Sequence, residues 1–500
     1  MTGTNTSIKP FTRVLIGGLM LLGLAGCTTL NPATGKSEFT PFMSPAKEAS
    51  LGAEAHPSVL KEHGGVYDDP NIGGYVATIG GRLAAVSEMP DTQFTFTVLD
   101  SPIVNAFALP GGYIYVTRGI LALFNSEAEM ASVLGHEIGH VTARHTAKRY
   151  NQQVFAGILG AGVGVLAGSQ EVADMVSYGS QLYLLSYSRD QEYQSDSLGV
   201  RYTSRAGIDP YGATRMLDSL KAEHDLADLI ANRTGQERTP EFFSTHPNTE
   251  DRAQRALELA RTTGIPQGSR DPGHDRYLGV IDGMIYGDNP DQGLIRGRTF
   301  WHPKLLFTFD VPENYKLNNS SEAVVAQGSG AAEGSAVIFA GGSASGKSLE
   351  QYMNEAWKKI SANGALENYQ EMTINGMAGL TATTTGSLNN QPVLVRLVAI
   401  RYSADQAYHF LMIVPQNNVN ALEPPLKQMA YSFRRLNQNE AGKYRAKRIK
   451  VVTVQKGDTA QSLSRNMAFE DYQLDRFLTL NGLDRNSTLS IGQRLKLIVE

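Results

Sequence analysis

Apolar residues recur three or four positions apart between residues 130 and 141, which predicts an amphipathic helix that continues to about Arg149. Ser126, three residues before a glutamate, has the sequence of a capped helix start. A second helix is expected from about Tyr187 to Arg205, because Gly207 follows two residues later. We expect these two helices to form the framework of the first half of the chain.

Segments ahead of these helices have the composition of β-strands. Gln93–Asp100 and Tyr113–Thr117 are rich in β-branched and aromatic residues. Between them, NAFALPGG (residues 105–112) is expected to be extended and to end in a Pro-Gly-Gly turn. Further on, residues 154–168 are apolar and rich in glycine. For that stretch the sequence supports equally a hairpin arm that is mobile or touches a membrane and a buried core helix.

The second half of the chain alternates strands with turns. From residue 300 to about 436, several apolar runs predict strands and one amphipathic run predicts a helix at Leu349–Ile360, which together indicate a small two-layer α/β unit. The whole pattern divides the chain into a leader (1–26), a tether (27–47), a helix-rich domain with a small sheet (48–265), a linker (266–300), the α/β unit (301–436), a polar linker (437–450) and a C-terminal module (451–498).

The leader has the features of a secretion signal. Lys9 and Arg13 precede a short apolar run, Val14–Ala25, which is too short to span a bilayer. The run leads into LAGC, which resembles the lipobox of bacterial lipoproteins, whose cysteine is lipidated and becomes the mature N-terminus; here that cysteine is Cys27. Because Thr28 stands where an aspartate would mark inner-membrane retention, the resemblance implies a lipid anchor in the outer membrane that faces the periplasm. The alternative is a cleaved signal followed by a chance cysteine.

Composition narrows the class of partner. Hydrophobic residues make up 41% of the chain and charged residues 19%, as in ordinary globular proteins. The formal net charge of −4 provides no basic field, so no nucleic-acid partner is expected. Cys27 is the only cysteine, which excludes internal disulfides and makes the chain compatible with an oxidising compartment.

Three histidines and a glutamate lie close together in LGHEIGHVTARH, residues 134–145. His136 and His140 are four positions apart on a predicted helix, so both side chains project from one face and can share one Zn²⁺. Glu137 lies beside them, where it can take a proton from a water whose pKa zinc lowers to about 7. The pattern predicts a hydrolytic zinc site rather than two solvated histidines.

A catalytic zinc needs a third protein ligand, and two candidates compete for that place. His145 follows His140 by five positions, which turns it away from the ligand face, so we expect it to cap or solvate the end of the helix. Glu192 and Asp196 are four positions apart on the second predicted helix and can both face the first. Glu192 is therefore predicted to bind zinc, and Asp196 to accept the N–H of a ligating histidine.

HEIGH, followed later in the chain by SRDQEYQSD, resembles the M48 peptidases, which are zinc gluzincins with a glutamate as third ligand and an aspartate downstream. NAFALPGG is similar to the strand that flanks the substrate in this family, and STHPNTEDR (Ser244–Arg252) to its loop before a late helix. The resemblance covers about residues 45–265. It departs from the family at Ser195, where alanine is usual.

The resemblance implies a set of site residues. The implied zinc ligands are His136, His140 and Glu192, with Glu137 as general base. The backbone of Asn105, Ala106, Phe107 and Ala108 would pair with an extended substrate, which provides affinity with little sequence preference. His246 would stabilise the oxyanion or fill the open zinc position, unless it is only a loop histidine.

GGSASGKS, residues 341–348, fits the phosphate-binding pattern G-x-x-x-x-G-K-[ST] and lies between a predicted strand and a predicted helix. The surrounding unit has no series of parallel βα units and no Walker-B aspartate at the end of an apolar strand. A polar turn is the favoured interpretation, so no nucleotide partner is expected.

Residues 451–498 resemble a LysM domain, a βααβ binder of N-acetylglucosamine-containing glycans, because VQKGDT, LNGL and IGQRLKL occur in the expected order. The implied ligand is peptidoglycan. Ala460 replaces a larger apolar residue that is usual after the Asp-Thr pair, so a LysM fold used for protein contacts stays open.

Together these features predict an α+β protein: a helix-rich gluzincin domain with a small β-sheet, a small two-layer α/β domain and a LysM module. The function hypothesis is a zinc endopeptidase, with one zinc per chain, that is anchored in the periplasm to the outer membrane through Cys27. Its substrates would be extended or misfolded envelope proteins, in outer-membrane protein quality control. The alternative is a chaperone or binding scaffold whose metal site is vestigial or held shut.

Overall fold

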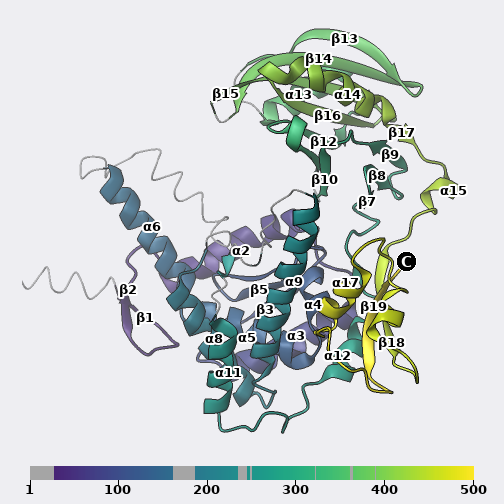
Figure 1. The fold of residues 1–500 in the computed structure, drawn as a ribbon. Helices are drawn as coiled ribbons and strands as arrows, with labels where there is room; N and C mark the ends of the chain where they lie inside the picture. The colour runs from purple at the N-terminus through teal and green to yellow at the C-terminus, as the bar shows by residue number, and fades with distance from the viewer. Residues whose placement is uncertain are drawn as a thin grey trace, which may run out of the picture.

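The computed structural model of the chain describes residues 28–161, 186–234, 242, 245–247, 251–320, 323–360, 364–388 and 390–500. Figure 1 shows a helix-rich domain, a domain built around a large sheet (green) and a C-terminal module (yellow) beside the first domain. This mixture of helices and sheets confirms the predicted α+β class. The predicted leader and Cys27 lie outside the described residues. Within the described ranges, no helix has the length and apolar character needed to cross a membrane.

A three-stranded sheet lies in the first domain. Its order is β3-β5-β4, in which β3 (Thr95–Leu99) is parallel and β4 (Ala106–Leu109) antiparallel to β5 (Tyr113–Thr117). The predicted turn after β4 is confirmed, since Gly111 and Gly112 have φ of +83° and +91°, a region that favours glycine. In the order β3-β5-β4, β4 is a terminal strand of this sheet.

Eight helices of the described chain surround this sheet or extend from it. They are α2 (Pro45–Glu62), α3 (Pro70–Ala85), α4 (Arg118–Leu123), α5 (Glu127–Thr142), α6 (His145–Ala161), α8 (Arg189–Arg205), α9 (Gly212–Thr234) and α11 (Arg252–Thr262). α5 starts at the predicted cap, where Ser126 Oγ accepts from the backbone N–H of Glu129 at 3.3 Å. It ends before the predicted Arg149, because Arg144 has φ of +53° and a new helix starts at His145.

Glycines bring α5 and α8 unusually close together. A Cβ on Gly139 would lie 3.2 Å from the Cα of Ser195, and one on Gly135 would lie 3.2 Å from the Cα of Gly199. Larger residues at these positions would force the two helices apart. The close approach presents the ligand face of α5 directly to α8.

The segment predicted as a tether is partly folded. β1 (Thr28–Leu30) and β2 (Ser37–Phe39) form an antiparallel hairpin. Asn31 between them donates to the carbonyl oxygen of Ala143 at 3.0 Å, just after α5 ends. The prediction of an irregular tether is therefore wrong for this hairpin. Of the apolar stretch 154–168, the first part belongs to α6 and the rest lies outside the described residues.

The segment 266–300 is also more ordered than a linker. It contains α12 (His274–Ile281), β6 (Ile285–Tyr286), β7 (Leu294–Arg296) and the start of β8 (Thr299–His302). Tyr277 and Leu278 of α12 are fully buried in the main core, and β6 joins the sheet of the C-terminal module. The prediction of a plain linker is wrong here.

The C-terminal module has the predicted βααβ order: β18 (Lys447–Thr453), α16 (Ala460–Ser464), α17 (Gln473–Leu480) and β19 (Arg494–Val499). It shares one hydrophobic core with the first domain. Lys496 of β19 is fully buried, and its Nζ donates to the carbonyl oxygens of Ala122 and Phe124 at 2.7 Å each, at the end of α4. The module is therefore an integrated part of the first domain.

The middle domain is built on a seven-stranded antiparallel sheet of order β10-β11-β12-β16-β15-β14-β13. The strands are β10 (Tyr315–Asn319), β11 (Val324–Gly328), β12 (Ala336–Ser343), β13 (Glu367–Ile374), β14 (Met377–Leu388), β15 (Gln391–Arg401) and β16 (Gln406–Pro415). A smaller sheet joins β7 and β8 with β9 (Phe307–Asp310) and β17 (Arg434–Arg435), and a short helix, α15 (Gln438–Ala441), follows.

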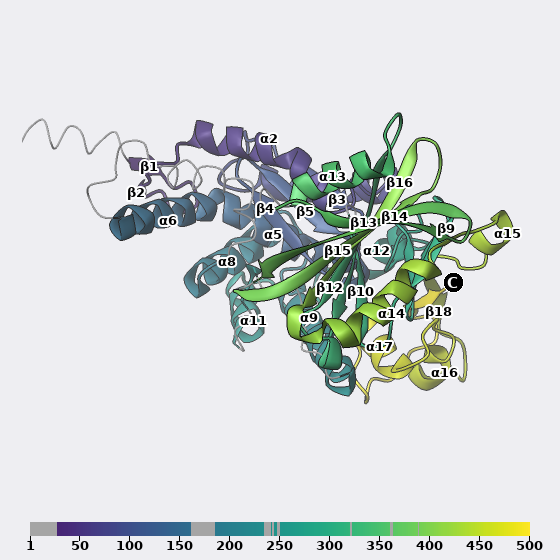
Figure 2. The same cartoon turned by 90° about the horizontal axis from the view of Figure 1, so that it is seen from above.

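Two helices cover opposite faces of the large sheet, as Figure 2 shows. α13 (Leu349–Ile360) is the predicted helix and packs on Leu397 and Ala399, whereas α14 (Val419–Ser432) packs on the face of Val398 and Ile400. The domain therefore has three layers where two were predicted.

The phosphate-loop pattern lies in the antiparallel sheet. Gly341 to Ser343 continue β12, and the amino group of Lys347 pairs with the Glu355 carboxylate at 2.5 Å. A nucleotide loop requires a parallel βα unit, which this sheet does not contain among its described strands. The interpretation as a turn agrees with this geometry.

Candidate metal centre

His136 and His140 project from the same face of α5, as their spacing predicts. Their Nε2 atoms are 2.9 Å apart, and both residues are buried. Two imidazole nitrogens that face each other at this distance form one half of a metal site.

Glu192 enters the centre from α8, which its close packing on α5 makes possible. Its Oε1 lies 3.4 Å from His140 Nε2 and its Oε2 3.6 Å from His136 Nε2. Burial alone would raise the pKa of the Glu192 carboxyl, but the neighbouring His246 and His136 hold it well below its usual range. An ionised carboxylate thus faces the two imidazoles, as a third ligand requires.

Asp196 orients His136. The Nδ1–H of His136 donates to Asp196 Oδ1 at 2.9 Å, which leaves Nε2 free as the ligand atom. Arg252 of α11 holds Asp196 in turn through two hydrogen bonds of 2.7 and 2.9 Å, and its Nη1 lies 2.8 Å from Glu192 Oε2. Although burial opposes it, this guanidinium holds the pKa of Asp196 below its usual range. One buried arginine therefore fixes both Glu192 and Asp196.

His145 has the same role for His140. The Nδ1–H of His140 donates to His145 Nδ1 at 2.9 Å, and the Nε2–H of His145 donates to Gln194 Oε1 at 3.0 Å. Burial lowers the pKa of His145 to about 3, so the ring is neutral and its Nδ1 can accept. The prediction that His145 is a solvated bystander is wrong: it is fully buried and orients a ligand.

Glu137 lies beside the ligands without binding any of them. Neither of its carboxylate oxygens has a hydrogen-bond partner within the described part of the chain. Burial raises the pKa of Glu137, although His246 and His136 oppose the shift. A buried carboxylate with a raised pKa and no hydrogen-bond partner among the described residues suits a general base.

His246 lies inside the same cluster rather than in a solvated loop. It is fully buried, and its Nδ1 is 3.1 Å from Glu192 Oε1 and 3.4 Å from His136 Nε2. Its Nε2 is 3.7 Å from Glu137 Oε1. The alternative of a plain loop histidine does not agree with this burial, whereas both functional roles predicted for His246 agree with its position.

The residues present fit a zinc ion. Ligand atoms of His136, His140, Glu192 and His246 all lie within 4.8 Å of one another. His246 Nε2 is buried and lacks a hydrogen-bond partner among the described residues, which is costly unless a cation is near. Three nitrogen donors and one carboxylate oxygen are ligands that zinc accepts.

β4 brings the predicted substrate-binding residues to the edge of the small sheet. Ala106, Phe107 and Ala108 are buried strand residues, and on its outer side β4 has no partner strand in the described ranges. Asn105 is buried at the start of this strand, and its Oδ1 has no hydrogen-bond partner among these residues.

Sequence reasoning missed Arg252 and the role of His145. Two acids that are four positions apart beside two histidines carry an uncompensated negative charge, which is a signal that a buried cation is needed. STHPNTEDR contains that arginine. Its contact with Glu192 and Asp196, however, depends on how α11 packs on α8.

This arrangement is that of a metal-dependent hydrolase, and comparison with known proteins agrees. Residues 71–260 match the family model for Peptidase family M48, and residues 452–497 match that for the LysM domain. The chain therefore contains a metallopeptidase domain of family M48 and a LysM domain, which confirms both resemblances.

Named relatives match about a third of the chain or slightly more. The beta-barrel assembly-enhancing protease of Yersinia pestis is 30% identical over 201 residues, 38% of this chain and 40% of that protein. The mitochondrial metalloendopeptidase OMA1 of Arabidopsis thaliana is 33% identical over 172 residues, 34% of this chain and 32% of that protein. The chain thus spans less than half the length of these relatives.

A solved structure, LpqN of Mycobacterium tuberculosis, is similar over 26% of this chain and 83% of its own, with 11% identity and a TM-score of 0.21. A likeness at this level supports no conclusion about function.

Proposed function

We propose that this protein is a zinc-dependent endopeptidase of the bacterial cell envelope that hydrolyses peptide bonds of extended or misfolded proteins. The observation that carries the proposal is the convergence of His136, His140 and Glu192 on one point, with the buried carboxylate of Glu137 beside it. When bound there, zinc polarises a water and the substrate carbonyl.

Side chains of the protein carry out proton transfer and hold the ligands in place. Glu137 takes the proton of the attacking water at a carboxylate oxygen and passes it to the leaving amine. Asp196 and His145 hold the two ligating imidazoles in the tautomer that presents Nε2. Arg252 keeps Glu192 and Asp196 in place.

The substrate is proposed to be an extended polypeptide that adds to the outer edge of β4, which has no partner strand in the described part of the chain. Strand addition uses backbone hydrogen bonds, so it tolerates many sequences, as a quality-control protease requires. The names of the bacterial relatives support a role in the assembly of outer-membrane β-barrel proteins. A lipid on Cys27 would place the enzyme at the outer membrane, and the LysM domain would hold it on peptidoglycan.

A second candidate is a binding scaffold whose metal site is held shut. It is favoured by the position of His246, whose Nδ1 lies close enough to the other donors to be a fourth ligand and thus exclude substrate. The reading in which His246 stabilises the oxyanion predicts the opposite effect of its removal.

Cleavage of unfolded casein by the full-length zinc-loaded protein tests these alternatives. We expect wild type to cleave and Glu137→Gln to be inactive. His246→Ala should raise the rate if this histidine blocks the metal, and lower it about 10²–10³-fold if it stabilises the oxyanion. A wild type and a His246→Ala variant that both bind zinc yet never cleave would overturn the peptidase proposal. For the physiological substrate, envelope proteins that accumulate with Glu137→Gln but not with wild type would be identified.

A further inference from the structure

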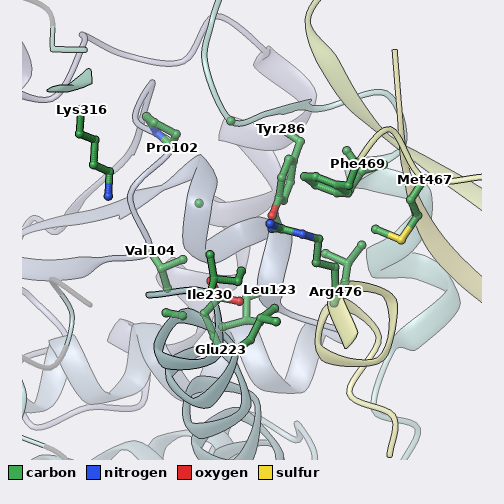
Figure 3. A pocket seen from close by; sticks show the side chains of 17 residues that line it. Pro102, Val104, Leu123, Glu223, Ile230, Tyr286, Lys316, Met467, Phe469 and Arg476 are labelled. Atoms are coloured by element: carbon green, nitrogen blue, oxygen red, sulfur yellow. The ribbon is translucent and has the colours of Figure 1, made fainter. Parts of the chain in front are cut away.

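A cavity of about 280 Å³ lies between the first domain and the C-terminal module, away from the metal ligands. Figure 3 shows its lining, to which the loop before β4, α9, β6 and the LysM domain all contribute. This volume approaches the roughly 300–1,000 Å³ of typical ligand pockets. The cavity therefore has room for more than a single side chain.

Two walls of the cavity belong to elements that also border the metal centre. Pro102 and Val104 lie in the segment that leads into Asn105 and β4. Leu226 and Ile230 come from α9, and about two to four turns earlier the same helix lines a small cavity beside His136 with Leu217 and Leu220. The cavity thus lies between the segment that leads into β4 and the later turns of α9.

The wall formed by the segment before β4, which contains Pro102 and Val104, is held against α4. The backbone N–H of Gly119 donates to the carbonyl oxygen of Ser101 at 3.1 Å, and a Cβ on Gly119 would lie 2.4 Å from the carbonyl oxygen of Pro102. Only glycine permits this approach, so the position of the loop is fixed by the fold.

The outer wall is formed by the C-terminal module and β6. Phe469 meets Tyr286 edge-on with ring centroids 6.1 Å apart, and the guanidinium of Arg476 lies over Phe469 at 4.5 Å. Arg476 is itself fixed by a 3.1 Å hydrogen bond to Asp471. This wall is an ordered aromatic and cationic surface rather than a random gap between domains.

We propose that this cavity is a substrate subsite, in which an apolar side chain of the extended polypeptide binds beyond the end of β4. The inference rests on the proposed function, and it makes the LysM domain part of the peptidase's substrate-binding site. A strand that pairs with β4 continues past Asn105 at about 3.3 Å per residue, so its residues opposite Val104 and Pro102 reach the cavity. The lining combines apolar side chains with polar surface and the charged groups of Glu223, Lys316 and Arg476, and this mixed character suits a side chain of a polypeptide better than a lipid chain.

Filling the cavity tests the proposal. Ala227 of α9 lines it, and Ala227→Trp would occupy it without touching a metal ligand. Leu229→Trp is the matched control, because Leu229 is an exposed residue of the same helix outside the cavity. Both substitutions are made in full-length Glu137→Gln protein, and the dissociation constant for a fluorescently labelled unfolded casein is measured with zinc present. Circular dichroism establishes that each variant is folded.

We expect Ala227→Trp to weaken casein binding at least about tenfold and Leu229→Trp to leave it unchanged. In the active enzyme, a peptide series with one phenylalanine moved along an alanine-rich sequence should show a preference at one position within about four residues of the cleaved bond, and Ala227→Trp should remove it. Equal binding by the two tryptophan variants would overturn the proposal, as would competition by N-acetylglucosamine oligomers, which would assign the cavity to glycan. If wild type cleaves nothing, the proposed function fails, but the binding measurement still decides the subsite.

Discussion

Arg252→Met is expected to disable the metal centre without altering any of its ligands. Arg252 is buried with the carboxylates of Glu192 and Asp196, whose side chains are 1% and 10% exposed. Removing one partner from such a cluster costs about 3–5 kcal/mol, because the remaining charges stay buried without compensation. Loss of a group that orients metal ligands lowers metal affinity about 10–100-fold.

The assay is a competitive zinc titration against a chromophoric chelator, combined with thermal unfolding with and without zinc. Arg252→Met should show both weaker zinc binding and a lower Tm in the metal-free state. Arg252→Lys keeps the positive charge but loses the planar guanidinium that donates two hydrogen bonds side by side. Its zinc affinity and its Tm should therefore lie between those of wild type and of Arg252→Met. Arg261→Met, an exposed position on the same helix, is the control. Zinc affinity within twofold of wild type in a folded Arg252→Met protein would refute this reasoning.

Three further predictions concern buried groups. His145→Leu removes the acceptor for the Nδ1–H of His140, so zinc affinity should fall about 10–100-fold in the same titration, and unchanged affinity would count against the orienting role. Lys496→Met leaves carbonyl oxygens at the end of α4 without their donor and should lower the free energy of unfolding in urea by about 1–3 kcal/mol; no loss would mean that the contact contributes nothing. Burial lowers the pKa of His302 and of His409 from 6.5 to about 4, so the unfolded chain binds these protons more readily and stability is lost as the pH falls from about 6.5 to about 4. The free energy of unfolding of the middle domain, measured in urea, should therefore fall by about 2 kcal/mol per histidine between pH 7 and pH 5. His409→Phe should remove the part of this pH dependence that comes from His409. A urea midpoint that does not change with pH would contradict this prediction.

The metal ligands could be predicted because helical geometry is local. Two histidines four positions apart must share a face, whatever the rest of the fold does. Glu192 followed from its own helix and from the M48 resemblance. The contacts of His145 and Arg252 could not be predicted, because they depend on where α8 and α11 pack.

The errors in the predicted fold have the same origin, namely contacts between segments that are distant in the sequence. α14 was missed because Pro424 and Pro425 lie inside it and argue against a helix, yet its buried face of Leu422 and Leu426 packs on the large sheet. The composition of residues 266–300 predicts turns. However, β6 in this segment is a strand because its backbone pairs with β18, which is far away in the sequence. The LysM fold could be predicted from its motifs, whereas its shared core with the peptidase domain could not.

The most direct test of the zinc peptidase account compares wild type with Glu137→Gln, purified in parallel and measured for bound zinc and for casein cleavage. The account predicts one zinc per chain in both proteins, because Glu137 is not a ligand, and a loss of cleavage of at least about 10²-fold in the variant. Cleavage by Glu137→Gln at the wild-type rate, or loss of its zinc, would contradict the account.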